Sequence, residues 1–353
     1  MKKISVAILG ATGMIGQRFV QLLEDHPYFE LSGLYASERS DGKQLHETLK
    51  IRDHQFTEDS LNMRISAINI EEIAHTSRVA FSGLPSDIAG NIETELANAG
   101  VAVFSNASNH RMNDDVPLLI PECNADHLDV VKEQGSFANG GFIVTNANCS
   151  TTGIALPLKV LDNAFGLEQV IASTYQAISG AGYPGVPSLD ILGNIVPYIK
   201  GEEEKMESEL AKILGSLDNG KITNSNIQTM VNCARVPVVD GHLESLILRT
   251  SRDVSVEEIE EVMEEFRGEP QELQLPSAPL HPIIVRHEAD RPQPALDVLA
   301  GEPARARGMS AVVGRVRKKE NYIKMFVLSH NTLRGGAGGS VLNAELTASR
   351  GLL

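Results

Sequence analysis

The stretch Ile4-Ser5-Val6-Ala7-Ile8-Leu9-Gly10-Ala11-Thr12-Gly13-Met14-Ile15-Gly16 decides the fold of this 353-residue chain. Its first six residues form a nearly continuous apolar run, which is typical of a strand buried on both faces. Three glycines follow at a regular spacing, and an amphipathic helix is expected over 15–23. A second apolar run at 29–35 completes a strand–helix–strand unit. The pattern predicts an α/β fold whose first domain is a Rossmann-type nucleotide-binding sheet.

The glycine-rich loop is a candidate nucleotide-binding site. Gly10 allows a sharp turn, Gly13 lets the backbone approach a pyrophosphate, and Gly16 allows close packing of the helix on the strand. The cofactor contacts expected in this loop are Gly10, Thr12, Gly13, Met14 and Ile15. Because the spacing is GxxGxxG rather than GxGxxG, a tight strand–helix turn without a ligand is the alternative.

The residues after the second strand select between NAD and NADP. An acidic residue there binds the ribose 2′-hydroxyl of NAD, whereas cationic and hydroxyl side chains suit the 2′-phosphate of NADP. Ser37, Arg39, Ser40 and Lys43 therefore favour NADP(H) as the cofactor, although Glu38 lies among them. The alternative is a solvated loop that binds nothing.

Two further strands are expected at 78–81 and 101–105. Gly83 and Leu84 follow the first of them, and Asn106 follows the second. These positions lie where the carboxyl ends of parallel strands meet the ligand crevice of an open α/β sheet. We therefore expect Gly83 and Leu84 to contact the cofactor.

A second strand–turn–helix pattern carries a candidate nucleophile. An apolar run at 142–145 precedes Asn148-Cys149-Ser150-Thr151-Thr152, and apolar positions of helical period follow. A cysteine at a helix N-terminus meets free amide donors and the positive end of the helix dipole, and both favour the thiolate. A thiolate is a nucleophile for acyl transfer. The alternative is a buried structural cysteine.

The rest of the chain predicts a second, α+β domain with a mixed sheet. We expect strands at 170–176, 236–239, 243–248, 309–317 and 322–329, helices at 202–214 and 257–266, a loop at 178–187 and an irregular connection at 276–294. The final segment, 331–353, has four glycines before a helical run and is expected to return to the first domain. The predicted domains are 1–147, completed by 331–353, for the cofactor, and 148–330 for catalysis.

The composition is that of a globular enzyme, with 42% hydrophobic and 22% charged residues. A net charge of −15 argues against nucleic-acid and anionic-membrane partners. The three cysteines have no paired spacing, and neither CxxC nor HExxH occurs, so we expect neither disulfides nor a metal site. Without a signal peptide or a membrane-spanning apolar run, the expected location is the cytoplasm.

In combination, these motifs resemble the aspartate-β-semialdehyde dehydrogenases, in the branch found in archaea and fungi. The matching stretches are the glycine loop at 10–16, 146–151, 176–182, 235–242 and the terminal glycines at 335–339. The resemblance covers essentially the whole chain. It also implies a homodimer or homotetramer, with the second domain as the interface.

The resemblance implies a role for each candidate site residue. The catalytic residues are Cys149 as the acyl carrier, His242 as the general acid–base and Gln176 as a positioning group. The substrate-binding residues are Arg235 for the carboxylate, Glu202 for the amino group, Lys205 and Arg111 for the phosphate, and Asn148. The cofactor set extends to Ser179, Gly180, Asn331, Gly335 and Gly336.

The function that the resemblance implies is NADPH-dependent reductive dephosphorylation of L-aspartyl 4-phosphate, in the pathway to lysine, threonine, methionine and isoleucine. A malonyl-CoA reductase on the same scaffold is one alternative. A non-catalytic NADP-binding or redox-sensing protein is another, although such a protein would be expected to lose Cys149 or His242.

Overall fold

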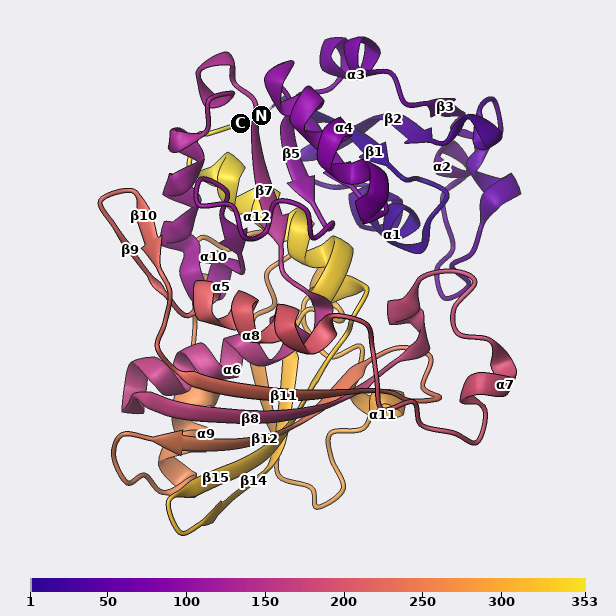
Figure 1. Ribbon diagram of the computed structural model, residues 1–353. Coiled ribbons are helices and arrows are strands. Elements are labelled where there is room, and N and C mark those ends of the chain that lie inside the picture. Colours follow the sequence, from indigo (N-terminus) through magenta and orange to yellow (C-terminus); the bar gives the residue numbers. More distant parts are fainter. Residues whose placement is uncertain (1) are drawn as a thin grey trace.

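A seven-stranded parallel sheet forms the first half of the protein, which is described here as a computed structural model covering residues 2–353 (Figure 1). The strand order is β3-β2-β1-β4-β5-β7-β6. The strands are β1 (Ile4–Leu9), β2 (Phe29–Ala36), β3 (Ile65–Ala67), β4 (Val79–Ser82), β5 (Ala102–Ser105), β6 (Leu118–Leu119) and β7 (Phe142–Asn146). This order confirms the predicted Rossmann-type domain, with the reversal of strand order between β1 and β4.

Both faces of this sheet are covered, which explains the continuous apolar run of β1. Val6 and Ile8 belong to a core shared with α1 (Met14–Leu23) and α12 (Gly338–Ser349). Ala7 and Leu9 belong to a separate core shared with α3 (Ile70–Thr76) and α4 (Ser86–Asn98). Since successive side chains point to opposite faces of a strand, a strand between two helical layers must be apolar at every position.

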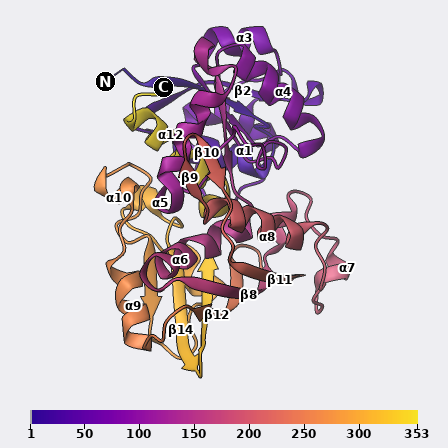
Figure 2. The same ribbon diagram turned by 60° about the vertical axis from the view of Figure 1, so that its left-hand side comes forward.

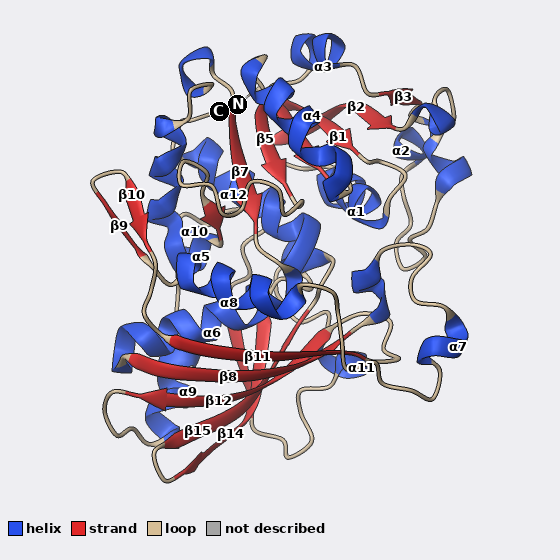
Figure 3. Cartoon of the chain, in the orientation of Figure 1, coloured by secondary structure: helices blue, strands red, loops and turns tan. Residues whose placement is uncertain are grey.

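The second sheet is mixed and has helices on one face (Figure 3). Its order is β11-β8-β12-β15-β14-β13, formed by β8 (Leu167–Gln176), β11 (Gln228–Arg235), β12 (His242–Thr250), β13 (Ile283–Arg286), β14 (Ala311–Lys319) and β15 (Tyr322–Ser329). Alternate residues of these strands pack beneath α6 (Cys149–Phe165), α8 (Glu202–Ile213) and α9 (Val256–Glu265). The remaining elements are short: α2 (Glu58–Asn62), α5 (Pro121–Asn124), α7 (Ser188–Ile191), α10 (Glu269–Glu272), α11 (Pro294–Asp297), β9 (Ser216–Asp218) and β10 (Lys221–Thr223).

Two expectations for the second domain are wrong. Residues 236–239, which were expected to form a strand, form a turn. The strand in this region is β11, which ends at Arg235 just before that turn. β11 escaped recognition because it is an edge strand with only short apolar runs, and its alternate residues Gln228, Met230 and Asn232 are exposed. The connection at 276–294 also contains β13, so it is less irregular than expected.

The C-terminal segment returns to the first domain, as expected. α12 packs against β5 and β7, and both views place it across the first domain from α3 and α4 (Figures 1 and 2). The turn before it is fixed by Arg334, whose guanidinium donates to both carboxylate oxygens of Glu122 at 2.7 and 2.8 Å. We propose the domain boundaries given above from this arrangement. In residues 2–353, no helix has both the length and the apolarity to cross a membrane.

We expect Gly16→Ala to destabilise the protein. A Cβ at position 16 would lie 2.2 Å from the carbonyl oxygen of Gly10. Neither atom can rotate away, because the oxygen belongs to the backbone and the Cβ is bonded directly to it. Overpacking of this kind costs about 1–3 kcal/mol, and the distorted loop should also bind its nucleotide more weakly. Urea denaturation measures the change. Gly135→Ala is the control, since its Cβ would meet nothing within 4 Å; equal stability of both variants would contradict the argument.

Candidate active site

The site lies where four neighbouring strands of the first sheet end. β1, β4, β5 and β7 are adjacent, and they lead directly into Gly10, Gly83, Asn106 and the turn that carries Cys149. Because parallel strands end at the same edge of a sheet, these four segments converge. Together they line a pocket with residues of the second domain and of the C-terminal segment. The lining residues are Gly13, Met14, Ile15, Lys50, Gly83, Leu84, Pro85, Asn106, Arg111, Ala147, Asn148, Cys149, Ser179, Gly180, Gly182, Tyr183, Asn331, Thr332, Gly335 and Gly336.

The pocket contains most of the cofactor residues expected from the sequence. Gly13, Met14, Ile15, Gly83, Leu84, Ser179, Gly180, Asn331, Gly335 and Gly336 all line it. The N-terminus of α1 has no side-chain cap and no acidic residue in its first turn, so its amides are free for a pyrophosphate. These features fit a dinucleotide. Sequence reasoning missed Lys50 and Tyr183, whose ammonium and ring are 4.9 Å apart at the rim.

The four residues expected at a 2′-phosphate lie outside this pocket. Ser37, Arg39 and Lys43 are exposed and Ser40 is half-buried, all just after β2. β2 neighbours β1, so these side chains lie one strand away from the glycine loop. That is the position at which a Rossmann-type fold binds the ribose distal to the nicotinamide.

Asn148 shapes the turn that presents the nucleophile. Its side-chain oxygen accepts from the amides of Ser150 and Thr151 at 2.9 and 3.2 Å, which caps α6. Its side-chain amide donates to Glu202 at 2.8 Å. Cys149 therefore begins the helix, half-buried against the pocket. Gly335 passes so close that a Cβ there would lie 2.8 Å from the Cβ of Cys149.

His242 is the partner of Cys149. Its Nε2 lies 3.2 Å from the sulfur, and its Nδ1 accepts the backbone N–H of Ala177 at 3.1 Å. Since an amide can only donate, Nδ1 carries no proton. The proton of the neutral ring is therefore on Nε2 and points at the sulfur. A doubly protonated ring would set two N–H groups against each other at Nδ1, so the charged form of His242 is disfavoured.

Burial makes the resting pair neutral. Desolvation raises the pKa of Cys149 to about 12; Glu202 adds to the shift, while Arg235 and Arg111 oppose it. Desolvation also lowers the pKa of His242 to about 3, with a further contribution from Arg235. Desolvation thus opposes the thiolate that the start of a helix favours.

Arg235 and Gln176 complete the wall behind the nucleophile. Arg235 donates to the carbonyl of Ala177 at 2.8 Å and lies beside Gly180, where a Cβ would approach its Nη1 to 2.8 Å. The side-chain amide of Gln176 donates to Thr174 at 3.2 Å, while its side-chain oxygen Oε1 has no partner among the described residues. The expected carboxylate ligand and the expected positioning group are therefore brought close to the Cys149–His242 pair.

α8 supplies the charged side chains. Positions 202, 205, 209 and 212 recur at helical spacing and lie on one face. Glu202 and Lys205 were expected there, whereas Glu209 and Lys212 were missed, although the same spacing pointed to them. Glu209 accepts from Arg111 at 2.8 Å, and Lys212 donates to the carbonyls of Arg111, Asn113 and Val116 at 2.7–2.8 Å. Arg111 is thus held at the pocket wall.

Another buried acid that sequence reasoning missed lies beneath the nucleophile. Glu244 is completely buried, two residues after His242 on the same face of β12. Desolvation raises its pKa well above the ordinary carboxyl value; the nearby Ser150 hydroxyl opposes this shift and Glu202 adds to it. Burial therefore favours the protonated form of the Glu244 carboxyl.

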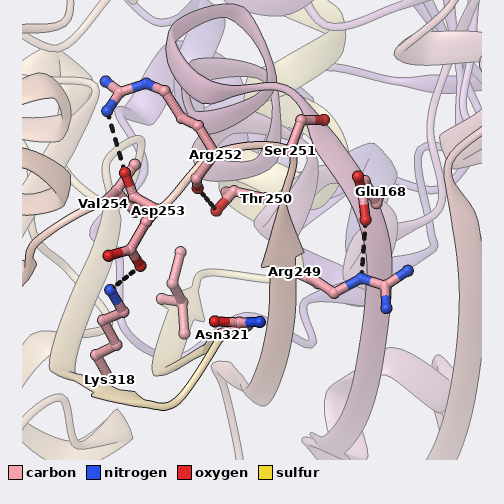
Figure 4. A pocket seen from close by; sticks show the side chains of 10 residues that line it. Glu168, Arg249, Thr250, Ser251, Arg252, Asp253, Val254, Lys318 and Asn321 are labelled. Carbon is pink, nitrogen blue, oxygen red and sulfur yellow. Dashed lines mark hydrogen bonds and ion pairs between the residues drawn. The ribbon is translucent and has the colours of Figure 1, made fainter.

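A different hollow, at the far end of the second sheet, lacks these features (Figure 4). Its charged side chains pair with one another: Arg249 with Glu168 at 2.9 Å, and Lys318 with Asp253. No cysteine, histidine or glycine loop lines it. The chemistry therefore belongs to the pocket at Cys149.

Two family models match the chain. The model described as semialdehyde dehydrogenase, NAD binding domain, matches residues 5–131, and the model described as semialdehyde dehydrogenase, dimerisation domain, matches residues 158–334. Together they span most of the chain and both of its sheets.

Relatives with the same overall length are also found. The chain is 46% identical to the aspartate-semialdehyde dehydrogenase of Archaeoglobus fulgidus, covering 98% of each chain. It is 42% identical to that of Saccharomyces cerevisiae, covering 100% of this chain and 99% of the other. The crystal structure of the Candida albicans enzyme with NADP superposes with a TM-score of 0.90, at 39% identity over 99% of this chain and 100% of that one.

The neutral pair predicts how Cys149 reacts with iodoacetamide. Because the pKa of the thiol is raised far above neutrality, the thiolate fraction should grow about tenfold per pH unit. The alkylation rate of the free enzyme should therefore rise steadily between pH 6 and pH 9. A rate that is constant below pH 7 would reveal a preformed thiolate–imidazolium pair. Cys149→Ser, in which the two remaining cysteines are buried, gives the background rate.

The raised pKa of Glu244 predicts a pH-dependent effect of Glu244→Gln. Its pKa in the folded state is raised, so above about pH 4.3 the unfolded chain loses a proton that the folded chain keeps, and stability falls as pH rises. The amide removes this penalty. The melting temperature of Glu244→Gln relative to the unsubstituted protein should therefore be higher at pH 8 than at pH 5. An equal difference at both pH values would contradict a raised pKa of Glu244 in the folded protein.

Proposed function

Because this chain belongs to the aspartate-semialdehyde dehydrogenase family, we propose that it converts L-aspartyl 4-phosphate and NADPH to L-aspartate 4-semialdehyde, phosphate and NADP. The observation that carries the proposal is the cysteine–histidine pair at the wall of the dinucleotide pocket. The reaction belongs to the route from aspartate to lysine, threonine, methionine and isoleucine. The enzyme is an NADP-dependent oxidoreductase.

The site chemistry follows from the need for a covalent acyl carrier. Hydride does not readily displace phosphate from an acyl phosphate, whereas sulfur does, and the resulting thioester is a good hydride acceptor. The sulfur of Cys149 bonds to the acyl carbon, the carbon–oxygen bond to phosphate breaks, and phosphate leaves with the bonding electrons and with the proton of the thiol. NADPH supplies the hydride.

His242 supports this chemistry as a hydrogen-bond donor. The resemblance implies general acid–base work for this residue, and its Nε2 already carries a proton in the resting tautomer, so that atom can donate a proton but cannot accept one. We propose that its N–H stabilises negative charge on sulfur or on the acyl oxygen as the tetrahedral intermediate forms. Accepting the thiol proton at Nε2 requires a prior change of tautomer.

We propose the substrate contacts from charge and position. Arg235 matches the α-carboxylate, since a planar guanidinium binds a carboxylate with two parallel hydrogen bonds. Glu202 keeps one oxygen for Asn148 and leaves the other for the substrate ammonium. Arg111 and Lys205 are the cations for the phosphate. Gln176 positions the acyl group.

We propose NADP(H) as the cofactor on two grounds. Ser37, Arg39, Ser40 and Lys43 offer hydroxyl and cationic groups for the 2′-phosphate, and the similar Candida albicans structure contains NADP. The malonyl-CoA reductase alternative is not favoured, because the relatives at 40–46% identity are all named aspartate-semialdehyde dehydrogenases.

The chain carries a dimerisation domain. We propose a homodimer or homotetramer built on the second sheet, whose uncovered face leaves Tyr175 and Met230 exposed. The segment that includes α7 projects from the second domain (Figure 1), and it also exposes the apolar side chains of Leu189, Leu192, Ile195 and Tyr198. We also propose a cytoplasmic location, where the free thiol of Cys149 stays reduced.

Replacing the nucleophile tests the mechanism. Cys149→Ala should fold, bind NADP and lose all turnover, because the proposed mechanism has no other residue that forms the thioester with the acyl group. The assay is phosphate-dependent oxidation of aspartate semialdehyde, followed by NADPH absorbance, with malonyl-CoA as the competing substrate. Cys233→Ala, which alters a buried cysteine of β11, is the control and should stay active.

Three outcomes would reject this proposal. Turnover by Cys149→Ala would exclude the thioester. Quenched enzyme without an acyl adduct on Cys149, as read by mass spectrometry, would do the same. Turnover of malonyl-CoA without turnover of aspartate semialdehyde would reassign the substrate.

A further inference from the structure

Glu209 is a buried carboxylate that joins two parts of the site. It is only 2% exposed, and each of its oxygens has one partner. Oε1 accepts from the guanidinium of Arg111 at 2.8 Å, and Oε2 accepts from the backbone amide of Asn148 at 2.7 Å. Arg111 comes from the loop after β5, and Asn148 from the turn after β7. One side chain of α8 thus spans two neighbouring strand ends.

The residues on both sides of Glu209 are themselves fixed. Asn148 is held at a second point, through its side chain, by Glu202. The loop that carries Arg111 is clamped by Lys212, whose ammonium donates to three of its carbonyls. Arg111 also donates to the carbonyl of Asn106 at 2.8 Å. A shift of one end is therefore transmitted through the carboxylate rather than absorbed by slack in the loop.

Arg111 keeps a donor for a ligand in this arrangement. Its two terminal nitrogens bind Glu209 and Asn106, while its Nε is buried and has no partner in the described residues. A buried donor without a partner is costly, and a phosphate oxygen would satisfy it. The contact to Glu209 need not break when an anion binds.

We propose that Glu209 is a positioning residue that couples the anion held by Arg111 to the backbone turn of the nucleophile. The carboxylate orients the guanidinium and fixes the amide next to Cys149 at the same time. Aligning the anion with the nucleophile in this way reduces the freedom that the reacting groups would otherwise lose in reaching the transition state. The anion side rests on the proposed function, whereas the effect on the turn does not.

Glu209→Gln tests the coupling. An amide offers one acceptor oxygen and a donating NH2 group, so only one of the two N–H partners can be satisfied. We expect kcat at saturating phosphate to fall, and the KM for phosphate to rise, each by about ten- to a hundredfold. Hydrogen exchange of the peptide that contains Asn148 should become faster, as read by mass spectrometry on the full-length protein.

Two variants separate the parts of this effect. Glu204→Gln makes the same change at an exposed position of α8 and should alter none of the three measurements. Arg111→Lys should raise the KM for phosphate while leaving hydrogen exchange at Asn148 unchanged. Glu209→Asp keeps the charge but is too short to reach both partners, so it should show the same losses at smaller size, and it serves if the amide variant folds poorly.

The outcomes distinguish this inference from the proposed function. If Glu209→Gln or Glu209→Asp leaves kcat and the exchange at Asn148 unchanged, the coupling is wrong and Glu209 merely holds an arginine. If the unsubstituted enzyme shows no phosphate-dependent turnover, the proposed function fails. The exchange measurement still decides whether Glu209 fixes the turn in that case.

Discussion

The starting point of α6 is the constraint on which the rest of the site depends. The helix begins at Cys149, three residues after the end of β7, so its first turn lies in the crevice of the parallel sheet. Its body packs into the core of the second sheet through Ile154, Leu158 and Leu161. A single rigid element therefore places the nucleophile relative to both domains. Because β12 lies directly beneath α6, the same packing brings His242 to the sulfur.

Burial by these two domains sets the electrostatics. A cysteine at the N-terminus of an exposed helix would gain from the dipole, but Cys149 sits against Glu202 and a low-dielectric wall, so the thiol is favoured. The amide of Ala177 then selects one tautomer of His242 and opposes its protonation. A neutral resting pair is protected from adventitious alkylation and oxidation, since both require the thiolate. The sulfur of Cys149 then reacts with an acyl group that is bound in the site rather than with small reagents from solvent.

The sequence predicts the elements whose structure depends on neighbouring residues, but it does not predict contacts between residues that are far apart in the chain. β1, the glycine loop and the turn at Cys149 follow from apolar runs, glycine spacing and helix periodicity. β11 was missed because an edge strand has no continuous apolar run, and its amides are satisfied from α8, where Glu203 and Glu207 accept from Cys233 and Val231. Glu209 and Glu244 were missed because their importance depends on partners far away in the chain. The desolvation that opposes the thiolate of Cys149 could not be predicted either, since burial cannot be read from its neighbours in sequence.

An acidic protein can still present a cationic pocket, and the manner in which the cations are anchored explains how. Arg235 is held by the carbonyl of Ala177, a neutral dipole that does not cancel its positive charge, although Glu202 acts on it electrostatically. Arg111 is the exception, because it is held by the carboxylate of Glu209. Anchoring by carbonyls preserves the attraction for an anionic substrate, whereas anchoring by a carboxylate weakens it in return for a rigid link to another group. The site accepts that loss at Arg111, whose carboxylate partner also binds the amide next to the nucleophile.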